Sequence, residues 1–244
     1  MCTDKIYQSI VDNIIMLYPS GSNTLYLDIG AGEGALIDRV IQAIPVKAEA
    51  CDLHIDRFKL PNVPIKKINL NAEPLAYQPS SFDLVTSTEV IEHLENPRGF
   101  FRDVARILKP GGHVLITTPN VLNLKSRLRY LISGFFSLFE PLPINPKEFF
   151  SIDSHITPIS SFYIAHGLES ANLKFINLVT DKYQKTSVLL LYLLWPILLI
   201  AWPFFYFRQA KQSYLKDCQP FVKLNLSLRV LLGRTVIFIA RKPN

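Results

Sequence analysis

The chain has 244 residues, of which 49% are hydrophobic and 19% are charged, with a formal net charge of +6 and a mean hydropathy of +0.20. We expect residues 1–244 to form a single domain with its own core, and the basic balance favours nucleic acid, phosphorylated substrates or a membrane surface as neighbours. The cysteines Cys2, Cys51 and Cys218 are widely separated, which argues against a disulfide framework or a zinc site and suits a reducing compartment.

The N-terminal segment lacks the features of a signal peptide, and apolar residues recur at helical spacing from Ile6 to Leu17, which predicts an amphipathic helix. Short β-rich runs then alternate with helical stretches, as in a parallel α/β sheet. We predict strands at residues 25–29, 46–51, 63–68, 82–87, 113–117, 173–180 and 235–240. We predict helices at residues 35–44, 89–108 and 160–171, and a mostly helical segment at 119–140.

An apolar insertion separates the last two predicted strands. Residues 187–207 contain no charged side chain, and their number is close to the ~20 that cross a bilayer. A single crossing would place two strands of one sheet on opposite sides of the membrane, and Pro196 and Pro203 can break or kink a helix. We therefore predict a bent, re-entrant or surface-lying membrane-associating element; a buried or oligomer-forming helix is the alternative.

A glycine-rich turn follows the first predicted strand. Gly30, Gly32 and Gly34 permit a sharp turn and a close approach of the backbone to a ligand. Asp52 ends the second strand, where a carboxylate accepts hydrogen bonds from ribose hydroxyls. The combination predicts a cofactor that contains adenosine, and a dinucleotide also fits this spacing. Asp28 and Glu33 would repel a pyrophosphate, whereas Asp28 suits the cationic amino group of S-adenosylmethionine.

Four ordered motifs carry a family resemblance: residues 27–34, 81–85, 89–94 and 108–112. They resemble class I S-adenosylmethionine-dependent methyltransferases, in the methyltransferase type 11 branch that includes the ubiquinone-pathway O-methyltransferases. The resemblance is close over residues 25–120. It implies a Rossmann-like seven-stranded sheet of order 3-2-1-4-5-7-6 with the last strand antiparallel, helices on both faces, and the apolar insertion between the last two strands. The cofactor-binding residues that we assign are Asp28, Gly30, Gly32, Gly34, Asp52, Leu53, Asn71, Ala72 and Thr88, with Asn71 (or, second to it, Asn69) at the position that meets adenine.

Two residues after the fourth strand are catalytic candidates. If the segment is helical, Glu89 and His93 lie one turn apart near the carboxyl edge of the sheet. We assign His93 as the base and place Glu89 nearer the cofactor. Glu89, Glu92, His93 and the distant His155 resemble the metal-binding arrangement of small-RNA 2′-O-methyltransferases. Because the Glu-His pair is common in metal-free relatives, we assign no metal ligand.

Two apolar segments are expected to leave the carboxyl edge of the sheet, where the cofactor would lie. Residues 121–140 form an amphipathic cover of the active site, with three basic residues that suit a phosphate, and residues 187–207 form the membrane-associating insertion. Basic residues at 208, 211 and 216 fit the cytoplasmic side of a membrane. We predict a peripheral or monotopic enzyme that methylates a membrane-held or lipid-linked acceptor, on oxygen.

Three other functions are compatible with the sequence. An RNA 2′-O-methyltransferase-like enzyme with a divalent metal fits the basic charge, although no RNA-binding module is visible and we expect no nucleic-acid partner. A non-catalytic scaffold that retains the cofactor fold is the second, and an intact glycine turn with Asp52 argues against it. A dehydrogenase is the third.

Overall fold

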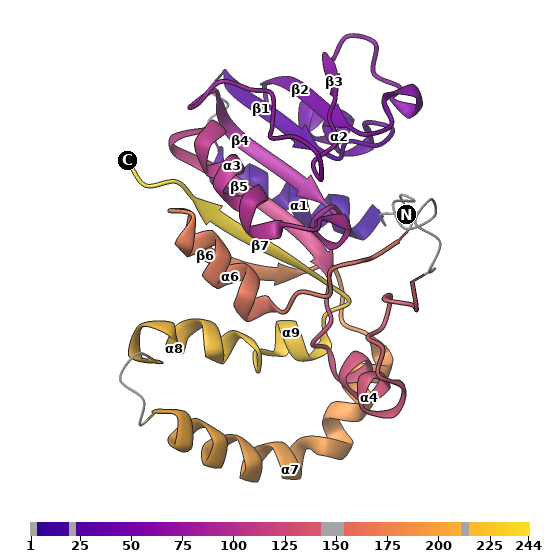
Figure 1. Cartoon of the computed structure of the whole chain (residues 1–244), viewed down its shortest axis with the longest axis vertical. Helices are drawn as coiled ribbons and strands as arrows, with labels where there is room; N and C mark the ends of the chain where they lie inside the picture. The colour runs from indigo at the N-terminus through magenta and orange to yellow at the C-terminus, as the bar shows by residue number, and fades with distance from the viewer. Residues whose placement is uncertain (1–3, 20–22, 143–153, 211–214) are drawn as a thin grey trace.

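The computed structural model describes residues 4–19, 23–142, 154–210 and 215–244, and for residues 202, 204–210 and 215–217 it describes the backbone alone. In this part of the chain, seven strands form one sheet of order β3-β2-β1-β4-β5-β7-β6 (Figure 1). The strands are β1 (Thr24–Ile29), β2 (Val46–Asp52), β3 (Ile65–Lys67), β4 (Phe82–Thr88), β5 (Leu108–Pro119), β6 (Lys174–Thr180) and β7 (Thr235–Arg241). Only β7 runs antiparallel to its neighbours in this sheet, so the predicted order and direction are confirmed.

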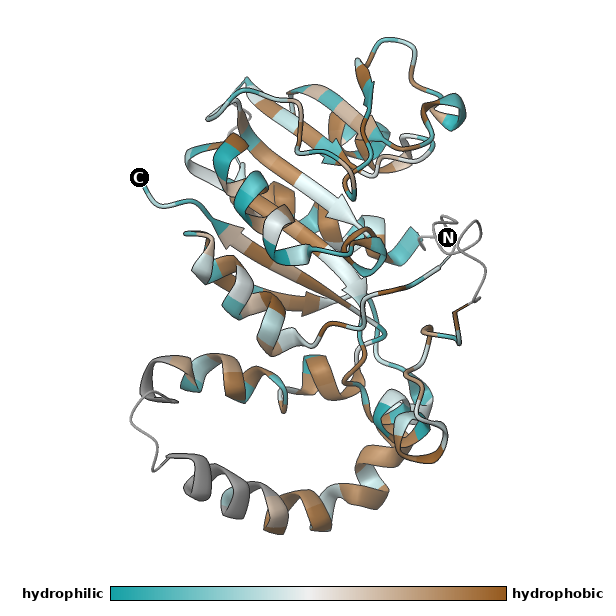
Figure 2. Ribbon diagram, viewed as in Figure 1, coloured by the Kyte–Doolittle hydropathy of each residue, from teal (hydrophilic) through white to brown (hydrophobic). Residues whose placement is uncertain are grey.

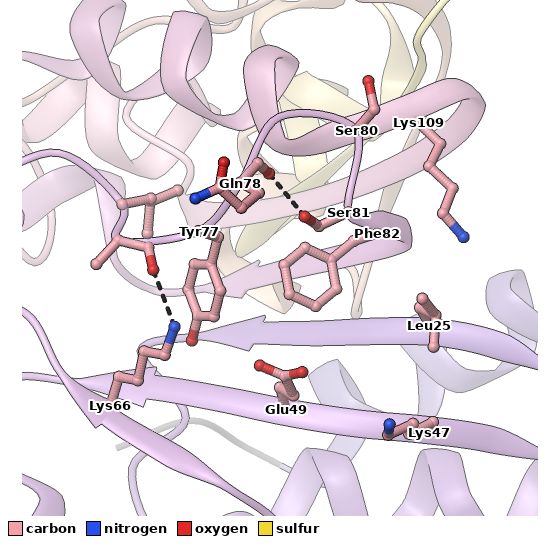
Figure 3. A pocket seen from close by; sticks show the side chains of 12 residues that line it. Leu25, Lys47, Glu49, Lys66, Tyr77, Gln78, Ser80, Ser81, Phe82 and Lys109 are labelled. Atoms are coloured by element: carbon pink, nitrogen blue, oxygen red, sulfur yellow. Dashed lines mark hydrogen bonds between the residues drawn. The ribbon is translucent and has the colours of Figure 1, made fainter.

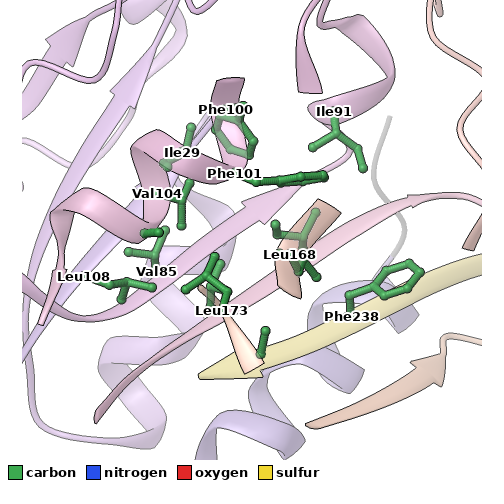
Figure 4. Packing of buried hydrophobic residues seen from close by; sticks show 14 of the residues in the cluster. Ile29, Val85, Ile91, Phe100, Phe101, Val104, Leu108, Leu168, Leu173 and Phe238 are labelled. Atoms are coloured by element: carbon green, nitrogen blue, oxygen red, sulfur yellow. The ribbon is translucent and has the colours of Figure 1, made fainter. Parts of the chain in front are cut away.

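Helices cover both faces of the sheet. On one face, α1 (Asp4–Leu17) and α2 (Ala35–Ala43) pack against β1, β4, β5 and β7. On the other face, α3 (Pro97–Ile107) and α6 (Ser161–Ser170) bury Phe101, Leu168 and their neighbours against the same strands (Figure 4). The predicted N-terminal helix is present because its apolar residues, spaced by three or four, form one buried stripe.

The predicted helix at residues 89–108 begins eight residues later than expected. Glu89 has a positive φ of 54°, and a single 3-10 turn, η2 (Ile91–His93), follows it. The α-helix starts only at Pro97, where the Asn96 side chain accepts a hydrogen bond from the N–H of Gly99 at 2.9 Å. Asparagine before the first turn and proline at its first position are typical of a helix start. The prediction that Glu89 and His93 share a helix face is therefore wrong.

Two other predicted bounds differ from the structure. The segment at 119–140 is helical only in α4 (Leu124–Ser133), and the third strand is confined to β3. A short 3-10 turn, η1 (Ile55–Arg57), follows β2. The Lys-Pro-Gly-Gly motif after α3 ends that helix as expected but lies inside β5.

The described residues of the connection between β6 and β7 form the helices α7 (Lys185–Ala210), α8 (Leu215–Leu224) and α9 (Leu228–Leu232). The helix α7 curves beneath the sheet (Figure 1), and it continues through Pro196 and Pro203 without ending at either. The first turns of α7 pack in a separate apolar cluster, whose buried residues are Leu124 of α4 and Leu231 and Leu232 of α9. No helix formed by fully described residues is both long enough and apolar enough to cross a membrane.

Candidate functional site

The glycine-rich turn is fixed to the carboxyl end of β2. The N–H of Gly30 donates to the Cys51 carbonyl at 2.9 Å. Each carboxylate oxygen of Asp52 accepts a backbone N–H, Oδ2 from Gly32 and Oδ1 from His54, both at 2.8 Å. An ionised carboxylate has about four acceptor positions. Asp52 therefore holds the turn in place and retains capacity for further donors such as ribose hydroxyls.

Two of the glycines are required for different reasons. A Cβ on Gly30 would lie 2.3 Å from Cγ2 of Val90, so only glycine fits beneath that side chain. A Cβ on Gly32 would meet nothing within 4 Å, and its φ of +54° sets the requirement instead. Open space therefore lies beside Gly32, next to the first N–H groups of α2. A ligand can approach the backbone closely at this point.

Asp28 is buried beside the turn and belongs to a chain of hydrogen bonds. Thr86 donates to Oδ1 of Asp28 at 2.6 Å, and the Tyr26 hydroxyl lies 2.7 Å from the Thr86 hydroxyl. Burial raises the pKa of Asp28 from its ordinary 3.8 to about 7; Thr86 opposes the shift and the negative charge of Asp52 adds to it. A cation bound here would compensate for the lost hydration of the carboxylate. The site therefore suits a ligand with a positively charged group.

Glu89 lies where β4 ends, in a backbone conformation that residues other than glycine rarely adopt. Its N–H is 3.0 Å from the hydroxyl oxygen of Thr117 on β5, which helps to hold that conformation. Burial raises the pKa of Glu89 to about 7, and the Thr117 hydroxyl and Arg234 partly offset the shift. Strained backbone of this kind is concentrated at functional sites. Glu89 thus lies at the sheet edge as predicted, although no helix positions it.

Glu92, His93 and His155 form a cluster in which potential ligand atoms lie within 4.8 Å of one another. His93 Nδ1 is 2.9 Å from the Ser154 carbonyl oxygen, and His155 Nδ1 is 2.7 Å from the Leu138 carbonyl oxygen. Because a carbonyl oxygen only accepts, both Nδ1 atoms carry the proton. In the neutral form of either ring the lone pair is then on Nε2, the atom that serves as a base or a metal ligand.

Asn71 connects its loop to the segment after β4. Its amide Nδ2 donates to the His93 carbonyl at 3.0 Å, and its Oδ1 accepts from the N–H of Glu95 at 2.9 Å. Asn71 and Ala72 are exposed next to this contact. The oxygen that we assigned to adenine is thus already an acceptor in the structure. It has one further lone pair for an adenine amino group.

Several buried polar atoms near the ends of β4 and β5 have no hydrogen-bond partner among the described residues. They are the hydroxyls of Ser87, Thr88 and Thr118 and both carboxylate oxygens of Glu92. Burial raises the pKa of Glu92 well above its ordinary value, with the charge of Glu89 adding to the effect. Buried polar groups are rarely left unsatisfied. Their concentration at this edge, with the partly exposed Leu53 after β2, fits a polar ligand bound there.

Sequence reasoning did not identify Tyr26, Thr86 and Thr117, which hold Asp28 and Glu89. The available signal was chemical: hydroxyl residues stand near the ends of strands that are otherwise apolar. Side chains alternate between the two faces of a strand, so the pattern indicates which of them lie together. The partner of each depends on the register between strands, which the sequence does not specify.

A separate cavity of about 850 Å³ opens on the amino half of the sheet (Figure 3). It lies at the first residues of several strands, among them Leu25, Lys47 and Phe82. Lys66 covers the ring of Tyr77 there, with Nζ 4.0 Å from the ring centroid. Open α/β sheets bind their ligands at the carboxyl ends of the strands. This cavity is therefore not the candidate site.

Comparisons with known proteins agree with the site at the carboxyl edge. A family model described as a methyltransferase domain matches residues 7–178. The ubiquinone biosynthesis O-methyltransferase of Albidiferax ferrireducens is 35% identical over 38% of this chain and 40% of its own length, so the match spans well under half of that relative. The enzyme of the same name from Ralstonia nicotianae is 30% identical over 66% of this chain and 70% of its own.

A solved S-adenosylmethionine-dependent methyltransferase from Archaeoglobus fulgidus has the same fold, with a TM-score of 0.57 at 15% identity, over 97% of this chain and 94% of that one. The family model ends within β6, so α7, α8 and α9 lie outside the matched region. With the strand order and the glycine turn, the match over most of the chain shows the family. The chain belongs to the class I S-adenosylmethionine-dependent methyltransferases.

Proposed function

We propose that this protein transfers a methyl group from S-adenosylmethionine to a hydroxyl oxygen of a lipid-like acceptor held in a membrane. The protein is peripheral or monotopic and acts on the cytoplasmic side. The observation that carries the acceptor class is the arrangement at the carboxyl edge: α4 follows β5 and α7 follows β6 at the same edge of the sheet that carries Asp28 and Asp52. Relatives named ubiquinone biosynthesis O-methyltransferase support transfer to oxygen.

The proposed chemistry assigns a role to each side chain around the turn. S-adenosylmethionine supplies an electrophilic methyl group and carries a positive charge. Asp52 accepts the ribose hydroxyls, and Asp28 offsets the charge of the amino group. His93 has its Nδ1 proton directed to the Ser154 carbonyl, so Nε2 accepts the proton of the attacking hydroxyl. Glu89 lies beside this region and shapes its charge. Positioning supplies most of the remaining acceleration.

The acceptor class is tested with two phenolic acceptors that differ only in a prenyl tail. We expect kcat/KM to be at least about tenfold higher for the tailed acceptor, because each buried CH₂ contributes ~0.8 kcal/mol. Methyl transfer is measured from radiolabelled donor in mild detergent, with S-adenosylhomocysteine binding as the control for folding. Equal rates with both acceptors would contradict a lipid-like acceptor. An RNA oligonucleotide in the same assay tests the RNA 2′-O-methyltransferase alternative.

A divalent cation is a second proposal, favoured by the Glu92, His93 and His155 cluster. Carboxylate and imidazole together suit Mg²⁺ or Mn²⁺, and no hydrogen bond reaches either Glu92 oxygen among the described residues. Glu92, His93 and His155 would hold the cation, whose charge would orient the acceptor oxygen and lower the pKa of its hydroxyl. His93 would then be a ligand and not the base.

Removal of the cation tests this second proposal. We expect a chelator to lower methyl transfer by at least about tenfold and added Mg²⁺ to restore it. His155→Ala should raise the Mg²⁺ concentration needed for half-maximal rate. The matched control is His166→Ala, on α6, which removes an imidazole remote from the cluster. If the chelator leaves the rate of methyl transfer unchanged, the cation proposal is wrong and the cluster binds no catalytic metal.

A further inference from the structure

The outer side of α7 is an exposed apolar stripe. Leu189, Leu193, Ile197 and Ile200 follow one another at spacings of three or four residues, and Tyr192 lies three residues after Leu189, which places all five on one side of the helix. Their exposed fractions lie between 60% and 77%. The described side chains along α7 are apolar for almost its whole length (Figure 2). Exposed apolar patches of this kind mark interaction surfaces.

The helix α4 extends the same end of the molecule. It packs against α7, and the N–H of Lys125 lies 3.3 Å from the Ser187 hydroxyl. Leu131 and Ile132 of α4 are 81% and 76% exposed. Both helices leave the carboxyl edge of the sheet, where the glycine turn lies. The helix α4 and the start of α7 therefore lie at the same edge of the sheet as the glycine turn, toward its β6 end.

The charge around the stripe is positive. Residues 182–210 contain three basic residues and no acidic one. Two of the basic residues that the sequence suggested for a phosphate have partners within the protein. Arg127 donates hydrogen bonds to the carbonyls of Leu122 and Asn225. Arg129 forms an ion pair with Glu140 at 2.8 Å. The phosphate prediction is thus wrong for Arg127, whose role is structural. Lys125 and Lys185 are exposed beside the apolar surface.

These observations favour one occupant. An apolar face with aromatic residues and basic neighbours matches the interface of an anionic bilayer. A second copy of the chain would bring two positive surfaces together across the same stripe, which opposes association. The pairing of β6 with β7 returns the chain to the sheet that it left. A helix within such a connection can lie along a bilayer surface without separating the strands.

We propose that the outer stripe of α7 docks on an anionic lipid surface, with the helix lying in the plane of the headgroups and the β6 end of the sheet toward the lipid (Figure 1). The inference deepens the proposed function and rests on it in one respect, namely that the acceptor is held in the same bilayer. Docking holds the enzyme at the bilayer that contains the acceptor.

The two tryptophans of the chain, Trp195 and Trp202, both lie in α7 and are native reporters of docking. Vesicles of phosphatidylcholine, with and without phosphatidylglycerol, are added to the wild-type protein. We expect a blue shift of tryptophan emission and quenching by brominated lipid chains, stronger with phosphatidylglycerol and weakened by salt. Leu193→Glu and Ile197→Glu should each weaken vesicle binding by about tenfold or more.

The matched control is Met16→Glu, which introduces the same charge at a 75% exposed apolar residue of α1, a helix that packs on one face of the sheet. It should bind vesicles like the wild type. S-adenosylhomocysteine binding confirms that each variant is folded. The proposal would be overturned in favour of a second copy if the wild-type protein bound neither type of vesicle and formed a dimer that Leu193→Glu dissociates.

The two proposals fail in different ways. A wild-type protein that methylates the tailed acceptor in detergent but binds no vesicle would overturn docking and leave the function in place. A wild-type protein that docks, binds S-adenosylhomocysteine and methylates neither phenolic acceptor would support docking and overturn the proposed acceptor.

Discussion

Asp52→Ala is expected to weaken S-adenosylhomocysteine binding by roughly 10²–10³-fold. Hydrogen bonds to a charged group contribute ~1.5–3 kcal/mol each, and the proposed role gives Asp52 two ribose hydroxyls. The variant also removes the acceptor for the N–H groups of Gly32 and His54. The turn would then be ordered by the ligand, which lowers the affinity further. Calorimetry at fixed pH and salt measures the change.

Two further variants separate charge from position at this site. Asp52→Asn keeps one carbonyl acceptor and should lose less affinity than Asp52→Ala. Asp56→Ala removes a carboxylate from η1, four residues along the chain, and should bind S-adenosylhomocysteine like the wild type. If Asp52→Ala retained wild-type affinity while folded, the glycine turn would not be the cofactor site.

Asp28→Asn is expected to stabilise the protein without cofactor and to impair the binding of S-adenosylhomocysteine. The pKa of Asp28 is raised from 3.8 to about 7 in the folded state, so the folded protein binds the proton more tightly than the unfolded chain. The associated stability is present below about pH 4 and is lost as the pH rises through 7. At about 1.4 kcal/mol per pKa unit, the charged carboxylate costs roughly 4 kcal/mol near pH 8. The amide retains an acceptor for Thr86 and avoids that cost.

Thermal unfolding at two pH values measures this difference. Near pH 8 the variant should unfold roughly 8–15 °C above the wild type, and the difference should nearly vanish as the pH falls to about 4. S-adenosylhomocysteine binding should show the opposite preference. The wild type should bind more tightly as the pH rises from 6 to 8, because its carboxylate becomes charged, whereas the variant should not. A variant with lower stability near pH 8 would refute the burial cost assigned to Asp28.

The elements with the strongest local patterns were predicted correctly from sequence. The short alternating runs identified all strands of the described sheet, and the family resemblance supplied their order. The glycine turn and Asp52 were recognisable because their spacing encodes one local geometry. Helix starts depend on fewer residues, and the prediction for 89–108 overlooked Asn96 and Pro97. These two residues by themselves indicate the start of a helix. The asparagine side chain caps the first turn, and proline has no N–H, which is not needed there because the first N–H groups of a helix have no partner within it.

Other features depend on contacts that no local pattern encodes. The positive φ of Glu89 arises from its N–H contact with Thr117, a residue on another strand. His155 reaches His93 across 62 positions, with ring centroids 4.9 Å apart. The helix α7 tolerates Pro196 because that residue is exposed. There, water can bond the carbonyl that the proline leaves without an N–H. The sequence indicated which residue types matter here, and the tertiary structure determines which of them meet.

The place of β7 in the sheet sets the order in which this protein can fold. β7 lies between β5 and β6, yet it follows both of them in the chain, after the whole of α7. During synthesis the ribosome therefore releases the apolar helix while two strands still lack their common neighbour. Joining β5 to β7 closes a loop of more than a hundred residues, and such distant pairings form slowly. For that interval the nascent chain exposes both a strand edge and an apolar helix, and a nearby lipid surface would shield the helix from aggregation.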